Sequence, residues 1–123
     1  MVLLGYNTPV HHPPAPEHDL LGNFHNQLSM QAGAYQNATW VIGVAKGGTE
    51  EGVPSLADSM IVAPSGKVVA RAAGSDDELI VHRCDLDATV FGKQTIFDFA
   101  RHRRPEHYGR ITAQVGVEPP PKG

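Results

Sequence analysis

A chain of 123 residues can form one domain at most, and its 41% hydrophobic and 19% charged residues are typical of a globular protein rather than a disordered one. The net charge of −3 excludes an electrostatic basis for binding nucleic acid or an anionic membrane surface. The single cysteine excludes an internal disulfide, and no apolar stretch approaches the roughly 18 residues that span a bilayer, so a cytoplasmic protein is expected.

The first third of the chain predicts a strand, a loop and a long helix. Residues 2–6 form an apolar run too short for a helix, which predicts a buried strand. Residues 11–16 hold three prolines and predict an extended loop, because proline removes a backbone donor and restricts the residue before it. From Glu17 to Gln36, apolar residues recur at steps of three and four and acidic residues lie in the first turn, which predicts an amphipathic helix. Its apolar positions are Leu21, Phe24, Leu28, Ala32 and Tyr35.

The middle of the chain predicts further strands. Residues 39–45 are apolar on both faces, which predicts a strand covered on both sides, and a glycine-rich loop follows at 47–54. Turns at 64–66 and 74–77 separate three segments of strand character, which predicts a meander with strands at 59–63, 67–71 and 78–86. The mixture of a helix with strands, one of them covered twice, predicts a layered α/β fold.

Cys84 is the one possible thiolate nucleophile. In the predicted third meander strand it shares a face with His82, which suggests a His–Cys dyad. Residues two apart on a strand are separated by about 6.6 Å, however, whereas proton transfer needs about 3 Å. We therefore expect Cys84 to be a small apolar side chain of the core without a catalytic role.

Four histidines lie within fifteen residues and raise the question of a metal site. None of the pairs among them has the one-turn spacing of a helical metal site, and prolines separate the first two from the others. We expect polar loop and helix-surface histidines, and no bound metal, for His11, His12, His18 and His25.

Two charged clusters have ordinary explanations as well. Glu50 and Glu51 could act as an acid–base pair, but adjacent acids in a glycine-rich loop are usually solvated. The basic run Arg101–Arg104 has no partner patch elsewhere, which favours a solvated or interface segment over a nucleic-acid site.

An ordered series of local motifs extends from about residue 2 to residue 111. It includes Gly-Tyr-Asn-Thr-Pro at 5–9, Ser-x-Ile-Val-Ala-Pro-x-Gly at 59–66 and His-Arg-x-Pro-x-His-Tyr-Gly at 102–109. In this order the motifs resemble the segment that follows the catalytic elbow in N-carbamoyl-D-amino-acid amidohydrolases, a branch of the nitrilase, or carbon-nitrogen hydrolase, superfamily. Further matching stretches lie at 13–19, 28–37, 50–52 and 85–87.

The resemblance implies part of a four-layer α-β-β-α sandwich with its N-terminal portion missing. Residues 1–111 would be the C-terminal part of a carbon-nitrogen hydrolase domain and 112–123 a proline-rich tail. The family assembles as homo-oligomers, and the resemblance implies no cofactor. Residues 102–109 resemble an arm that packs across the subunit interface.

The implied activity is hydrolysis of an N-carbamoyl amino acid to the amino acid, ammonia and carbon dioxide. The family uses a cysteine nucleophile, a glutamate base and a lysine for the tetrahedral intermediate, since an amide-type carbon needs all three functions. All three lie upstream of the matched segment, so we assign no catalytic residue here and expect the chain to be inactive alone. The alternative is a truncated, non-catalytic chain that serves only as an interaction or scaffold piece.

Asn7 and Thr8 are the predicted substrate-binding residues. They match the family loop in which a side-chain amide and a hydroxyl can bond the substrate's carboxylate end. The alternative is that they only form a turn before Pro9. One departure is clear as well: Ala57 and Asp58 replace a Gly-His pair of the family.

Overall fold

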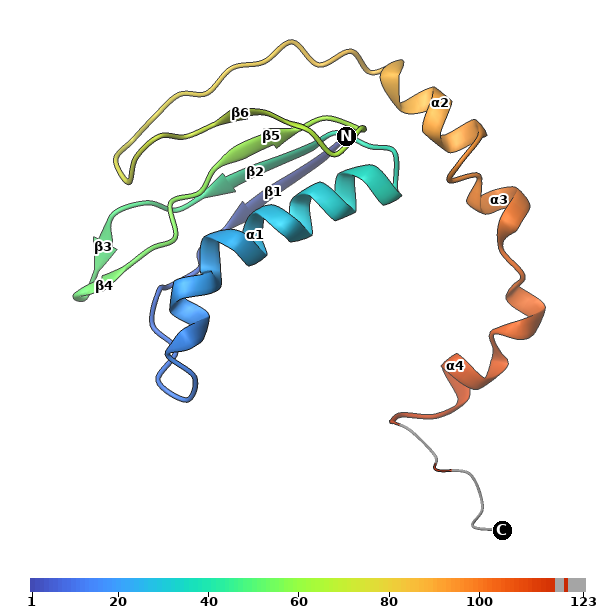
Figure 1. The fold of residues 1–123 in the computed structure, drawn as a ribbon, viewed down its shortest axis with the longest axis horizontal. Coiled ribbons are helices and arrows are strands. Elements are labelled where there is room, and N and C mark those ends of the chain that lie inside the picture. The colour runs from blue at the N-terminus through green and yellow to red at the C-terminus, as the bar shows by residue number, and fades with distance from the viewer. Residues whose placement is uncertain (117–118, 120–123) are drawn as a thin grey trace.

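The computed structural model describes residues 1–116 and 119. A small sheet lies against one long helix, and the chain then leads away from the sheet through short helices (Figure 1). In chain order the elements are β1 (Val2–Tyr6), α1 (Glu17–Gln36), β2 (Val41–Ala45), β3 (Thr49–Glu50), β4 (Val53–Pro54), β5 (Met60–Val62), β6 (Val68–Arg71), α2 (Ala88–Gln94), α3 (Phe99–His102), a 3₁₀ turn (Pro105–His107) and α4 (Gly109–Ala113).

The four-stranded sheet has the order β1-β2-β5-β6. β1 and β2 are parallel, with Val2 opposite Val41, and α1 is the crossover that a parallel pair requires. β5 and β6 follow as antiparallel neighbours, joined by the turn at 64–66. The predicted helix and the strands at 2–6, 59–63 and 67–71 are thereby confirmed, as is the α/β class.

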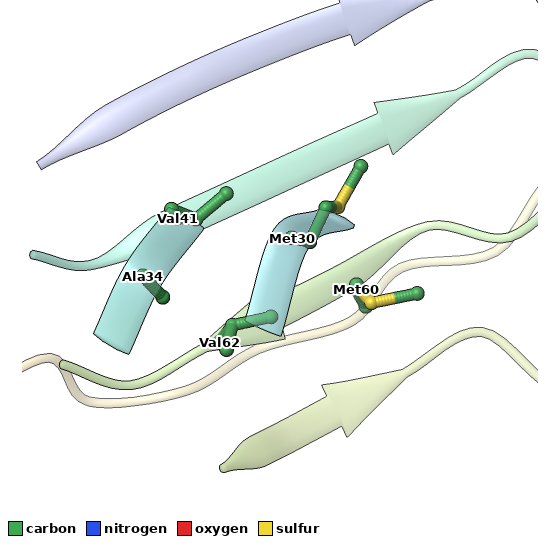
Figure 2. Close-up of a cluster of buried hydrophobic side chains, with 5 residues drawn as sticks. All are labelled: Met30, Ala34, Val41, Met60 and Val62. Atoms are coloured by element: carbon green, nitrogen blue, oxygen red, sulfur yellow. The ribbon is translucent and has the colours of Figure 1, made fainter. Parts of the chain in front are cut away.

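The core lies between α1 and the sheet. Met30 and Ala34 of the helix pack on Val41 of β2 and on Met60 and Val62 of β5, and all five side chains are buried (Figure 2). Gly43 of β2 permits this approach, because a Cβ atom there would lie 2.5 Å from Met30 Cε. The closeness of helix and sheet therefore depends on the absence of a side chain in the middle of β2.

β1 is exposed, so the prediction of a buried strand is wrong. Leu3 is 70% exposed, and Val2 and Leu4 are also open to solvent. The reason is topological: β1 is an edge strand, paired on one side only, and α1 covers just one face of the sheet (Figure 1). Because α1 covers one face of the sheet only, Val44 on β2 is exposed as well. The prediction that this strand is covered on both sides is therefore wrong. The apolar sequence therefore identified which residues form strands, but not whether those strands are buried.

The apolar stripe of α1 faces away from the sheet. Phe24 is 60% exposed and Leu28 is 51% exposed, whereas Met30 and Ala34 are buried. With 3.6 residues per turn, Leu28 projects about 160° around the helix axis from Met30, and Phe24 about 120°. The periodicity predicted the helix correctly, but the side that contacts the sheet carries only two buried apolar residues beside Asn26 and Gln27.

The third meander strand is not formed. Residues 79–85 run without a pairing partner among the described residues, and they are attached through Trp40, whose Nε1 donates to the Asp85 carbonyl at 2.7 Å. Alternating polar and apolar residues there predicted a strand, but alternation does not supply a hydrogen-bonding neighbour. The loop at 47–54 instead contains the β3–β4 hairpin.

The C-terminal region, called the arm below, consists of short helices, and the packing of residues 102–109 across a subunit interface stays a prediction. α2, α3 and α4 succeed one another away from the sheet (Figure 1). Of the predicted tail at 112–123, residues 117–118 and 120–123 lie outside the described residues. Within the described part of the chain, no helix combines the length and the apolarity needed to cross a membrane.

Candidate functional site

The loop that carries Asn7 and Thr8 begins where β1 ends and is fixed through its backbone. The Thr8 carbonyl accepts the Leu56 N–H at 2.9 Å, and the Val10 N–H donates to the Pro54 carbonyl at 2.8 Å. Pro9 pairs with Ser55 between these two bonds. The carboxyl ends of parallel strands are where open α/β sheets usually hold ligands, so the loop has both the location and the rigidity of a binding segment.

Thr8 lines a cavity of about 960 Å³ between β1, α1 and the start of the arm. Its walls include Tyr6 of β1, Asn26 and Ser29 of α1, and Phe97 and Phe99 beyond α2. This volume lies within the range of pockets for small molecules, and a mainly apolar wall with a few polar groups is typical of them. Asn7 lies at the exposed side of the same loop.

The alternative role of Asn7 and Thr8, formation of a turn before Pro9, has no support from side-chain hydrogen bonds among the described residues. Across residues 1–116, the side chains of Asn7 and Thr8 form no bond that would define a turn before Pro9. Both residues are exposed and accessible to a ligand. Their substrate-binding role stays a prediction.

A partly buried polar network, with Asp58 at its centre, lies directly behind this loop. The Tyr6 hydroxyl donates to the Asp58 carbonyl at 2.8 Å, and Asn26 Nδ2 donates to the Tyr6 hydroxyl at 3.1 Å and to Asp58 Oδ2 at 3.0 Å. Asp58 is only 2% exposed, and its Oδ1 accepts from Arg71 Nε at 2.6 Å. Burial raises the pKa of the Tyr6 phenol above its ordinary value; the Asp58 charge adds to the rise, and the Asn26 hydrogen bond opposes it. Sequence reasoning missed this network, and its one signal was Asp58 in place of the family's histidine.

Ala57, next to Asp58, has a φ of 54°, in the left-handed region that favours glycine. The left-handed conformation costs a non-glycine residue about 1–2 kcal/mol, and glycine loses about 0.5–1 kcal/mol through its greater freedom when unfolded. We predict that Ala57→Gly raises the free energy of unfolding by about 0.5–1 kcal/mol. Urea denaturation would measure it, with Ala73→Gly, where φ is not positive, as a control that gains nothing. Equal effects of the two substitutions would contradict the prediction.

Cys84 has no arrangement for catalysis. Its Sγ lies 3.9 Å from the carbonyl oxygen of His82, while the His82 ring packs on Trp40 with 5.7 Å between ring centroids. Because residues 79–85 form no strand, the predicted shared core face of Cys84 and His82 does not exist, and that prediction is wrong.

The other candidate groups lie at the surface of the protein. Glu50 forms an ion pair with Lys46, and both side chains are exposed. His18 lies between His12 and His25, with ring centroids 5.6 Å and 6.0 Å away. Among the described residues, no group of three or more His, Cys, Asp or Glu side chains could hold a metal ion.

Comparison with known proteins connects this geometry to a family. Residues 3–94 match the family model of the carbon-nitrogen hydrolases. A carbon-nitrogen hydrolase from Helicobacter pylori G27 superposes with a TM-score of 0.69 at 17% identity, over 87% of this chain and 38% of that one. The NitFhit protein of C. elegans gives a TM-score of 0.61 at 24% identity, over 86% and 24% of the two chains. A Saccharomyces cerevisiae member of branch 10 of the nitrilase superfamily gives 0.54 at 24% identity, over 63% and 28%.

These structural similarities establish the fold of the chain and the share of that fold that the chain covers. The chain spans 24% to 38% of the length of these solved proteins. Its sheet and helix correspond to part of the nitrilase fold, in agreement with the expected partial domain. The family match covers three-quarters of the chain and includes β1, α1 and the loop that bears Thr8. The chain belongs to the carbon-nitrogen hydrolase family.

Proposed function

We propose that this chain contributes the substrate-carboxylate side of the active site in a hydrolase of N-carbamoyl amino acids. The observation that carries the proposal is the position of Thr8, which follows the carboxyl end of the parallel strand β1 and lines one end of the 960 Å³ cavity that runs along this strand. The Gly-Tyr-Asn-Thr-Pro motif at residues 5–9 supports the carbamoyl-amino-acid class over other carbon-nitrogen substrates.

The reaction is addition of water to an N-carbamoyl amino acid, which yields the amino acid, ammonia and carbon dioxide. Cys84 Sγ contacts the carbonyl oxygen of His82, the His82 ring packs on Trp40, and Glu50 is paired with Lys46. In this proposal the nucleophile, the base and the charge for the oxyanion therefore come from a segment outside this chain. The contribution of the chain is orientation. The Thr8 hydroxyl donates to the substrate carboxylate from the cavity wall, and the apolar part of the wall receives the side chain. Asn7 does not line the cavity, and its amide donates from the exposed side of the same loop.

The test uses an active enzyme in which the preceding part of an N-carbamoyl-D-amino-acid amidohydrolase, up to and including its nucleophile elbow, is joined to Met1. Thr8→Val keeps the shape and removes one hydrogen bond to a charged group, worth about 1.5–3 kcal/mol. We predict a KM raised roughly tenfold to hundredfold with kcat largely kept, measured by ammonia release.

Thr112→Val, on the arm and remote from the cavity, is the matched control and should leave both constants unchanged. An unchanged KM in Thr8→Val, or a fall in stability alone, would show that Thr8 is a turn residue. An inactive joined enzyme that is folded would contradict the proposed activity itself.

A further inference from the structure

Asp58 is the only buried acidic side chain among the described residues. We propose that Asp58 is a positioning residue, which together with Arg71 and Asn26 forms a clasp that holds the Thr8 loop in its ligand-binding position. The proposal rests on the proposed function, because it assigns the clasp to the same loop.

The clasp joins the elements that surround the loop. Asp58 stands just before β5, Arg71 ends β6, and Asn26 projects from the middle of α1. Asp58 Oδ1 accepts from Arg71 Nε at 2.6 Å and Oδ2 accepts from Asn26 Nδ2 at 3.0 Å, so each carboxylate oxygen has its own donor. Arg71 Nη1 also donates to Gln27 on α1 at 3.1 Å. The carboxylate thus connects helix and sheet at the end where β1 gives way to the loop.

Two hydrogen bonds connect the segment around Asp58 to the Thr8 loop. The first passes through Tyr6, two residues before Thr8, whose hydroxyl donates to the Asp58 carbonyl at 2.8 Å. The second passes through Leu56, two residues before Asp58, whose N–H donates to the Thr8 carbonyl at 2.9 Å. The loop is consequently held from both of its sides by the segment that Asp58 anchors.

The chemistry of the clasp requires a carboxylate. Two donors converge on Asp58, and an ionised carboxylate is a side chain that can accept from both without donating. An amide at this position would direct its NH₂ group at either Arg71 Nε or Asn26 Nδ2, so that two hydrogen-bond donors would face each other without an acceptor. The pairing also accounts for the departure from the family's Gly-His: an acid at 58 is compatible with burial because Arg71 supplies the opposite charge.

The test is site-resolved amide hydrogen exchange on the chain itself, in Asp58→Asn. Loss of a charge-assisted hydrogen bond should loosen the loop specifically, so we expect exchange at the Leu56 and Val10 amides to rise about tenfold or more. The Thr39 and Ala63 amides, which bond elsewhere in the fold, should change by less than about threefold. Asp76→Asn removes the same charge at an exposed site and should change none of them.

A second variant separates positioning from plain stability. When Asp58→Asn is combined with Arg71→Gln, the glutamine oxygen can accept from the new side-chain amide at position 58. Slow exchange at Leu56 and Val10 should then return to within about threefold of the original. Should Asp58→Asn fail to fold, Asn26→Ala gives the same comparison by removing one donor and leaving the ion pair.

A uniform rise at all four amides, or no rise at Leu56 and Val10, would overturn the clasp. These results do not depend on substrate, so they stand apart from the kinetic test of Thr8. A failed kinetic test with a loosened loop would contradict the proposed function and leave the clasp in place.

Discussion

Incubated with N-carbamoyl-D-amino acids, residues 1–123 are expected to release no ammonia above the buffer rate, and Cys84→Ala is expected to behave identically. Hydrolysis of an amide-type bond needs a nucleophile, a base and a charge for the oxyanion, which together accelerate such reactions at least about a millionfold. Cys84 has neither an imidazole directed at its sulfur nor a place on the cavity that Thr8 lines. The enzyme joined to a nucleophile-bearing segment, assayed in parallel, shows that the substrate and the ammonia measurement are sound.

Activity in the chain alone that disappears in Cys84→Ala would contradict this interpretation, because it would place the nucleophile within the described residues. Equal activity in both chains would point to a contaminating enzyme. A repeat with His82→Ala tests whether the His82 ring, once it leaves its contact with Trp40, serves as a base.

We propose that the chain associates with itself through the outer face of α1, and the second prediction with a large expected effect tests this association. This face carries Phe24 and Leu28, both more than half exposed, and residues 20–45 contain no Asp, Glu, Lys or Arg. A two-fold contact sets a surface against its own copy, so an uncharged stripe meets itself without like-charge repulsion. The helix of 20 residues is about 30 Å long, enough to form the centre of an interface.

Phe24→Lys with Leu28→Lys should weaken self-association about a hundredfold or more. Each buried Leu or Phe contributes about 1.5–3 kcal/mol, and both copies lose theirs. Sedimentation equilibrium over a range of concentrations would measure the change. Leu79→Lys, at an apolar residue away from α1 that is even more exposed (87%), is the control and should leave association unchanged.

The open edge of β1 is the competing contact. Its strand is apolar, exposed and free of charge, and such edges pair readily with other strands. Leu3→Lys distinguishes the two surfaces. If Leu3→Lys disperses the oligomer and the α1 substitutions do not, association through the helix is wrong. A monomer at all concentrations, with cooperative unfolding, would exclude both contacts.

Local patterns in the sequence determined which segments are helical or extended. α1 begins and ends at the predicted residues because a three- and four-residue periodicity and a proline-rich loop define it, and the turn at 64–66 defines β5 and β6. Asn7 and Thr8 were predicted from the resemblance of the motif at 5–9 to a family loop, and their role in binding stays a prediction.

Only the tertiary structure decided how those segments face one another. Whether β1 is an edge, which side of α1 meets the sheet, and whether residues 79–85 find a strand partner depend on neighbours far away in the chain. The Asp58 clasp is of the same kind, because Asn26, 32 residues before it, and Arg71, 13 residues after it, become its partners only when helix and sheet pack. Periodicity reports the shape of a segment, whereas burial and pairing are properties of the contacts between segments.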